Sequence, residues 1–292
     1  MVLSQAVHRA VEAISNAVPK NRWLYVAIAL LCYGLLLFAA WVAPEHYAEI
    51  NLDAAYAGPL EMFPFGADGR GRPLLDYATQ GARVVTFPAL VAGILVSMFA
   101  ILGGLLRCLG SANVNGWIQG FSEIVGALPR MVVVLVVALM MPRDMRGLLP
   151  LAVTWAVLAA PGAMDEASAV AGRLGGARFV EALRAHGYSM KRIYLYHVIG
   201  LNLRPIIVRQ GAEVMMQVVF LEIALSYLAI DQSQPSFTHP DSLRSWADLL
   251  YLGYSSVVFS GVPTMHALVL GLSLVGFVAV TSLAIARGVR AR

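Results

Sequence analysis

Six apolar stretches, most of them long enough to cross a lipid bilayer, constrain this chain more than any other feature of its sequence. A transmembrane helix needs about 20 consecutive, mainly apolar residues to span the hydrocarbon core. Of the 292 residues, 59% are hydrophobic and 13% are charged, a balance typical of membrane proteins rather than of soluble domains. The sequence therefore predicts an all-α integral membrane protein with about six transmembrane helices, at residues 24–42, 84–106, 120–141, 148–163, 198–230 and 266–286.

The basic residues indicate on which side of the membrane each connecting segment lies. Cytoplasmic segments of membrane proteins are enriched in Lys and Arg. Both termini are therefore expected in the cytoplasm of a multi-pass protein of a bacterial inner membrane. Twelve basic residues fall in the segments expected inside (Arg9, Lys20, Arg22, Arg107, Arg173, Arg178, Arg184, Lys191, Arg192, Arg287, Arg290 and Arg292), against five expected outside (Arg70, Arg72, Arg143, Arg146 and Arg244).

Composition shifts along the chain predict its domain organisation. A short N-terminal segment is expected to be cytoplasmic and amphipathic, with a frayed tail as the alternative, and the rest of the chain is expected to form one transmembrane domain. Two sizeable loops are predicted on the outer side and one polar loop on the inner side. The N-terminal segment is 1–22, the transmembrane domain 23–292, the outer loops about 44–80 and 231–264, and the inner loop about 166–197.

The inner loop contains the most charged internal stretch of the chain, residues 172–196. Its apolar and basic side chains separate on a helical wheel, so it is amphipathic and is not expected inside a bilayer. Gly187 stands where a helix needs a left-handed C-terminal residue, and Ser189 is a good N-cap for a following helix. The pattern predicts a helix, a glycine turn and a second helix below the membrane. The apolar set is Phe179, Val180, Leu183 and Met190, and the basic set is Arg178, Arg184, Lys191 and Arg192.

Several short motifs of the chain together resemble those of one protein family. E-A-L-R-A-H-G at 181–187 resembles the cytoplasmic E-A-A-x-x-x-G loop of the permease subunits of binding-protein-dependent ABC importers. F-G-A-D-G-R-G-R at 65–72, followed by G-A-R at 81–83, is similar to a stretch of the dipeptide, oligopeptide and nickel branch. E-I-A-L-S-Y-L at 222–228 and the later S-W at 245–246 are similar to that branch as well. The motifs occur in the order expected for that branch.

This resemblance implies a function, a set of partners and a docking site. The chain would form half of a translocation pathway for a small solute, first a peptide and alternatively nickel or a metal–metallophore complex. It would couple ATP hydrolysis in partner subunits to alternating access. Its partners would be a second, related permease subunit, two ATPase subunits that carry the ATP and Mg²⁺, an extracytoplasmic solute-binding protein and membrane lipid. The residues expected to contact the ATPase subunits are Glu181, Ala182, Leu183, His186 and Gly187.

A polar stripe in the fifth apolar stretch carries the alternative function. Arg209, Glu213 and Gln217 are spaced four residues apart, so they share one face of a helix. Charged groups at membrane depth are costly unless they are paired or face water. The stripe is therefore predicted to be either a buried Arg209–Glu213 pair or a lining of the pathway. As a coupling site, it is the basis of the competing hypothesis of a self-contained, ion-coupled carrier or channel.

The sequence indicates no catalytic, cofactor or metal site in this chain. A phosphate-binding P-loop requires Gly-Lys-Ser/Thr, and the only lysines, Lys20 and Lys191, follow Pro19 and Met190. The six histidines lack H-x-x-x-H or H-E-x-x-H spacing. No basic tract suggests a nucleic-acid partner. We therefore expect neither an enzyme nor a cofactor within this chain.

The topology can be tested by labelling single introduced cysteines from outside the cell. Reagents that do not cross the membrane should reach cysteines placed at Asp53 and Ser236, and should not reach cysteines at Gly187 and Arg290, because the inside bias of basic residues places the latter pair in the cytoplasm. Labelling of position 187 from outside would overturn the predicted orientation.

Overall fold

The structure is a computed structural model that describes residues 22–46, 48–108, 112–142, 147–173, 177–230, 244–255, 258 and 265–290. Within these residues the regular elements are helices, and the only β-type pairing is an isolated bridge between Ala67 and Pro73. The predicted all-α fold class is confirmed. The predicted N-terminal segment lies outside the described residues except for Arg22, and so do 231–243 of the second predicted outer loop.

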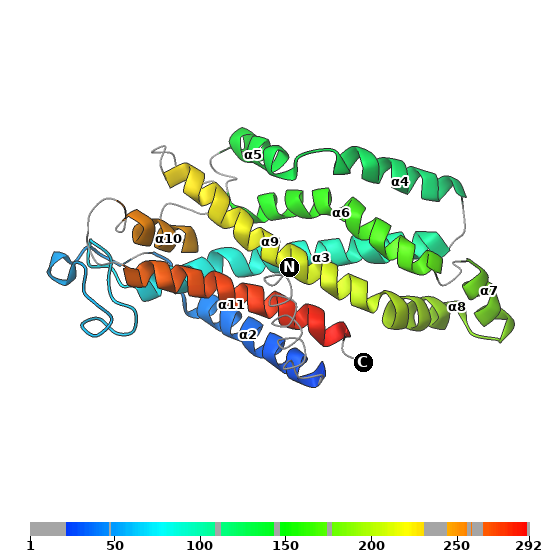
Figure 1. The fold of residues 1–292 in the computed structure, drawn as a ribbon, viewed down its shortest axis with the longest axis horizontal. Coiled ribbons are helices and arrows are strands. Elements are labelled where there is room, and N and C mark those ends of the chain that lie inside the picture. The colour runs from blue at the N-terminus through cyan, green and yellow to red at the C-terminus, as the bar shows by residue number, and fades with distance from the viewer. Residues whose placement is uncertain are drawn as a thin grey trace, which may run out of the picture.

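Long helices lie side by side along the long axis of the molecule, and shorter elements lie at its two ends (Figure 1). The segment between α2 and α3 occupies one end, and α7 protrudes at the other end (Figure 1). In order, the helices are α2 (Arg22–Val42), α3 (Leu74–Cys108), α4 (Ala112–Gly126), α5 (Arg130–Met140), α6 (Leu148–Arg173), α7 (Ala177–Ala185), α8 (Met190–Arg192), a π-helix (Ile193–Leu203), α9 (Arg204–Ile230), α10 (Trp246–Ser255) and α11 (Met265–Arg290), with a 3-10 turn at Leu52–Ala54.

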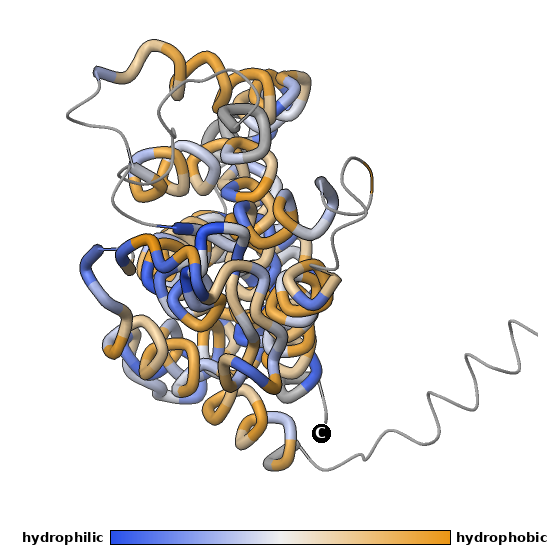
Figure 2. The backbone as a smooth tube through the Cα atoms, turned by 90° about the vertical axis from the view of Figure 1, so that its left-hand side faces the viewer, coloured by the Kyte–Doolittle hydropathy of each residue, from blue (hydrophilic) through white to orange (hydrophobic). Residues whose placement is uncertain are grey.

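Each of the six predicted apolar stretches is helical, although they do not all qualify as spans by composition. Among the described residues, four helices are long and apolar enough to cross a membrane: α2, α3, α6 and α11. The α4–α5 pair counts as a fifth if it is one broken span. Helix α9 has 27 residues, enough to span, but its own charged residues lower its hydropathy. Hydrophobic residues predominate along the helices (Figure 2), and large apolar side chains such as Leu30 and Trp41 of α2 are exposed.

The third predicted span is not one straight helix. Helices α4 and α5 meet at an angle of 73°, between Gly126 and Arg130. Pro129 precedes α5 with an extended backbone. Proline has no N–H to donate and disfavours helical geometry at the residue before it, which explains why the helix breaks here.

Two helices extend beyond the predicted spans. Helix α3 begins at Leu74, inside the predicted outer loop 44–80, because residues 77–81 pack beneath α10. Helix α6 continues to Arg173 rather than ending near residue 163. Its extension contains Asp165 and Glu166, whose carboxylates find partners on other helices, so these charges do not end the helix.

Close packing of small residues holds α3 against α6 and α9. A Cβ added at Gly103 of α3 would lie 2.6 Å from the Cα and carbonyl oxygen of Met164 on α6. A Cβ at Gly211 of α9 would lie 3.1 Å from the carbonyl oxygen of Gly93 on α3. Lipid tails are as apolar as Leu side chains, so there is no hydrophobic driving force that brings membrane helices together. Close backbone approach is therefore an important source of association between them. Helix α3 is therefore the central helix of the bundle.

This packing predicts different costs for two glycine substitutions. Gly103→Val should destabilise the protein by about 1–3 kcal/mol, because backbone atoms of α6 occupy the space that the new side chain needs. Gly276→Val in α11 is the control, since no atom lies within 4 Å of a Cβ at that exposed position. Thermal unfolding of the purified variants measures both effects, and equal melting temperatures would contradict the packing account.

Candidate functional site

Trp246, the first residue of α10, joins two of the motif segments at the end of the bundle that also carries residues 43–73. Its side chain is fully buried, and its indole N–H donates to the carbonyl oxygen of Ala78 at 3.0 Å. A Cβ at Gly81 would lie 2.2 Å from the Trp246 ring, so the G-A-R glycine leaves the space that the S-W tryptophan fills. The two motifs therefore form one packing unit.

The E-I-A-L-S-Y-L segment joins the same unit through Glu222 of α9. Glu222 is fully buried and accepts a hydrogen bond of 2.8 Å from the Ser226 hydroxyl. Its carboxyl group also lies against Ser245, next to Trp246. The backbone N–H of Arg244 donates to Gln80 Oε1 at 2.8 Å, which ties α10 to α3 a second time. These contacts give Glu222 a structural role at this end of α9.

Asp68 organises the F-G-A-D-G-R-G-R segment. Its Oδ1 accepts hydrogen bonds of 2.8 Å from the backbone N–H groups of Arg70 and Arg72, and its Oδ2 accepts one of 2.6 Å from the Tyr77 hydroxyl. Asp68 itself is buried. This motif therefore builds a folded loop and anchors it to the start of α3.

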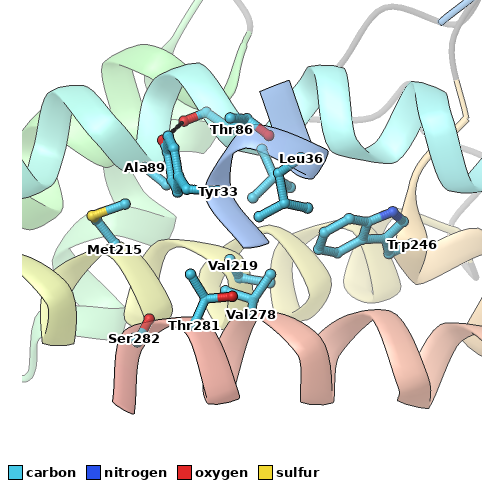
Figure 3. A pocket seen from close by; sticks show the side chains of 11 residues that line it. Tyr33, Leu36, Thr86, Ala89, Met215, Val219, Trp246, Val278, Thr281 and Ser282 are labelled. Carbon is cyan, nitrogen blue, oxygen red and sulfur yellow. Dashed lines mark hydrogen bonds between the residues drawn. The ribbon is translucent and has the colours of Figure 1, made fainter. Parts of the chain in front are cut away.

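A small apolar hollow lies among α2, α3, α9 and α11 (Figure 3). Trp246 lies at one end of the labelled group and Met215 at the other, and the Tyr33 hydroxyl donates to the carbonyl oxygen of Thr86 at 3.0 Å (Figure 3). The lining is almost entirely apolar, and its few hydroxyl groups include those of Thr281 and Ser282. The hollow offers no charged group to a polar cargo.

The predicted helix–glycine turn–helix at residues 177–192 is confirmed. Gly187 has φ +80°, and the two hydrogen bonds of a Schellman cap end α7. The N–H of Tyr188 donates to the carbonyl oxygen of Leu183 at 3.2 Å, and the N–H of Gly187 donates to that of Arg184 at 2.9 Å. Ser189 is the N-cap residue of α8 by position, although its hydroxyl makes no capping bond.

Helix α7 buries one side and exposes the other. Val180 is buried, and Phe179 and Leu183 pack against the core. Glu181, Ala182, His186 and Gly187 are exposed, and Leu183 is half-buried. Met190 was predicted to share the apolar side but is 44% exposed, because it lies beyond the turn. Four of the five predicted docking residues are therefore exposed to solvent on α7 and its cap.

An aromatic and cationic cluster connects the turn to the next helix. The Arg192 guanidinium carbon lies 5.0 Å from the centre of the Tyr188 ring, and the Tyr188 and His197 rings are 5.2 Å apart in an edge-to-face arrangement. His197 belongs to the π-helix that leads directly into α9. The turn thus packs against the π-helix that leads into α9.

The polar stripe of α9 does not form the predicted Arg209–Glu213 pair. The Arg209 guanidinium pairs with the Glu166 carboxylate of α6, and the Gln210 side-chain amide donates to the same carboxylate. Both charged side chains are about 30% exposed, 29% for Arg209 and 32% for Glu166. Of the two alternatives, the pair is therefore not formed, because α6 brings a carboxylate to Arg209 that the helical wheel of α9 alone could not show.

Glu213 and Gln217 belong to a separate hydrogen-bonded chain. The Trp155 indole N–H of α6 donates to Gln217 Oε1 at 2.9 Å, and Gln217 Nε2 donates to Glu213 Oε1 at 3.3 Å. Glu213 is exposed. The sequence analysis missed Trp155 and Glu166, although an acidic residue inside a long apolar helix is a signal that could have drawn attention to Glu166.

No protein-family model matches the chain. It is 22% identical to the oligopeptide transport system permease protein OppC of Bacillus subtilis (strain 168) over 235 residues, which cover 80% of this chain and 72% of that protein. It is 23% identical to the probable D,D-dipeptide transport system permease protein DdpC of Escherichia coli (strain K12) over 214 residues, which cover 72% of this chain and 69% of that protein.

The long apolar helices and the partly buried polar contacts between them are those of a helical membrane protein. Over most of its length, the chain is similar to permease proteins of peptide transport systems.

The polar contacts between α6 and α9 predict the outcome of a double-mutant cycle. Arg209→Ala and Glu166→Ala should be coupled by roughly 0.5–3 kcal/mol, because either single change leaves a partly buried charge without its partner. Arg209→Ala and Glu213→Ala should add instead, since these residues belong to different networks. Thermal unfolding of the purified variants measures both cycles. Stronger coupling of Arg209 to Glu213 than to Glu166 would restore the pair predicted from the sequence.

Proposed function

We propose that this chain is a permease subunit of an ABC importer that forms half of the pathway for a small solute. A second, related permease completes the pathway, two ATPase subunits bind below it, and an extracytoplasmic solute-binding protein delivers the cargo. The chain lies in the inner membrane with both termini in the cytoplasm. The names of the two relatives make peptides the first cargo to test, with nickel and metal–metallophore complexes as alternatives.

The exposed side of α7 is the observation that carries this proposal. A helix bundle that works without a partner protein does not need a capped amphipathic helix with one exposed side at its end. Helix α7 lies at the end opposite the segment between α2 and α3, and the start of α2 and the end of α11 lie toward the α7 end (Figure 1). This arrangement supports an ATPase docking site on the same side as both termini.

The proposed mechanism follows from how α7 is joined to the bundle. ATPase subunits grip Glu181, Ala182 and His186, and their closure moves α7. The Schellman turn and the contact between Tyr188 and His197 transmit that movement to the π-helix and then to α9. Since α9 packs on α3, the two helices move together and switch access from outside to inside.

The ion-coupled carrier is the weaker alternative. Its coupling site would use the polar stripe of α9, but Glu166 already neutralises Arg209. A carrier also has no use for an exposed docking helix.

Gly187 provides the sharpest test of coupling. Gly187→Val should leave the protein folded, because no atom lies within 4 Å of a Cβ there, but should strain the backbone at φ +80° by roughly 1–3 kcal/mol. The strain redirects the chain between α7 and α8, so ATP-driven uptake into proteoliposomes should fall at least about tenfold. Glu181→Lys should act similarly by reversing a charge on the docking side.

Gly187→Asn is the matched control, because asparagine tolerates the left-handed conformation and should keep most of the uptake. Normal uptake and normal ATPase binding in both Gly187→Val and Glu181→Lys would remove the main support for the importer.

A further inference from the structure

Glu213 is an exposed carboxylate in the middle of a helix of spanning length. It lies nine residues after Arg204, the first residue of α9, which is about 14 Å along the helix axis, and 17 residues before Ile230, its last. A charged group at such a depth is costly unless it meets water or a partner of opposite charge. Within the part of the chain that the structure describes, Glu213 has no ion-pair partner.

A hydrogen bond orients the Glu213 carboxylate. The Trp155 indole donates to the only oxygen of the Gln217 amide, which turns the amide nitrogen toward Glu213 Oε1. One carboxylate oxygen of Glu213 is thereby held, and the charge remains exposed. Arg209, one turn earlier on the same helix, is neutralised by Glu166. The two neighbouring charges therefore have different roles: Arg209 joins α9 to α6, and Glu213 is left to face outward.

A basic side chain of α5 lies at about the same height in the bundle as Glu213. Contacts of α9 with Glu166 and Trp155 fix the antiparallel register of α6 and place Gly162, which is exposed, at about the level of Glu213. The guanidinium of Arg130 approaches Gly162 from α5, at 3.9 Å from the position of an added Cβ. Arg130 begins α5, directly after the break at Pro129.

Irregular backbone at membrane depth is tolerated where it is buried in protein or lines a water-filled space. Here the break in the α4–α5 pair lies beside an exposed glycine of α6, at about the height of the exposed carboxylate on α9. An acid and a base at this level match a zwitterion better than they match a simple anion or an apolar solute.

We propose that Glu213, oriented by Gln217 and Trp155, binds the terminal ammonium group of a short peptide as the peptide passes through the membrane. This inference rests on the proposed importer function and assigns a substrate contact within it. An ammonium group supplies the positive charge that Glu213 lacks in the described residues, and it donates to the carboxylate oxygen that Gln217 leaves free.

Uptake by the complete importer in proteoliposomes tests this contact. The probe is an equimolar mixture of alanine peptides of two to five residues, quantified by mass spectrometry. Glu213→Gln keeps the shape and the hydrogen bond from Gln217 but removes the charge, so uptake at low peptide concentration should fall roughly tenfold or more. ATPase activity without peptide and recovery of the partner permease should stay normal. Glu213→Asp should retain part of the uptake.

Glu123→Gln is the matched control, because Glu123 is an exposed carboxylate of α4 that contacts Gln119. Its uptake should equal that of the wild type. Equal losses of uptake in Glu213→Gln and Glu123→Gln would mean that removing any exposed carboxylate of the bundle has this effect, and would overturn the proposal. Loss of the partner permease in Glu213→Gln would also overturn it, by making Glu213 a subunit contact.

A second measurement does not depend on transport. Glu213→Cys in the assembled importer should react with a hydrophilic thiol reagent, and the peptide mixture, delivered with the binding protein, should slow that reaction. A cysteine that does not react, or that reacts equally fast with peptide present, contradicts the proposal. If the wild-type importer takes up none of the peptides, the proposed peptide import fails. If it takes them up and Glu213→Gln does so equally well, only the ammonium contact fails.

Discussion

The close approach of α3 to α6 and α9 is the constraint on which the rest of the structure depends. Gly103 lets α3 contact the backbone of Met164, and Gly93 and Gly211 let α3 and α9 nearly touch. Such packing is specific because it depends on shape rather than on a general preference for apolar surroundings. It also packs α9 directly on α3, which is the contact that the proposed coupling requires.

Polar contacts connect the other helices around this core. The Glu166–Arg209 pair and the Trp155–Gln217 bond join α6 to α9 at two heights. At the end of the bundle that carries residues 43–73, Trp246, Gly81 and Glu222 form a buried unit that closes α10 onto α3 and α9. Exposed polar groups remain at α7 and at Glu213, among other positions of the described residues. The sites that we propose for coupling and for cargo are two of these positions.

Sequence patterns predicted the local features well and the contacts between helices poorly. The apolar stretches predicted the helices, and Gly187 predicted the turn, because length, periodicity and a left-handed glycine are properties of one segment. The Arg209–Glu213 pair was wrong because its true partner, Glu166, lies on another helix. The length of α6 was underestimated for the same reason, since its acidic residues are neutralised from outside the helix. The motifs near Gly81 and Trp246 were noticed separately, and only the fold shows that they form one unit.

The central claim is that α7 transmits the work of ATPase subunits to the bundle. The most direct test is disulfide cross-linking in the assembled complex, with single cysteines placed at Ala182 or His186 and a series of cysteines on the ATPase surface. We expect rapid cross-links from both positions, with a yield that changes when ATP is bound. A cysteine at Leu60, in the segment between α2 and α3, should form no cross-link. Absence of cross-links from α7 in a complex that imports peptide, or cross-links from Leu60 instead, would contradict it.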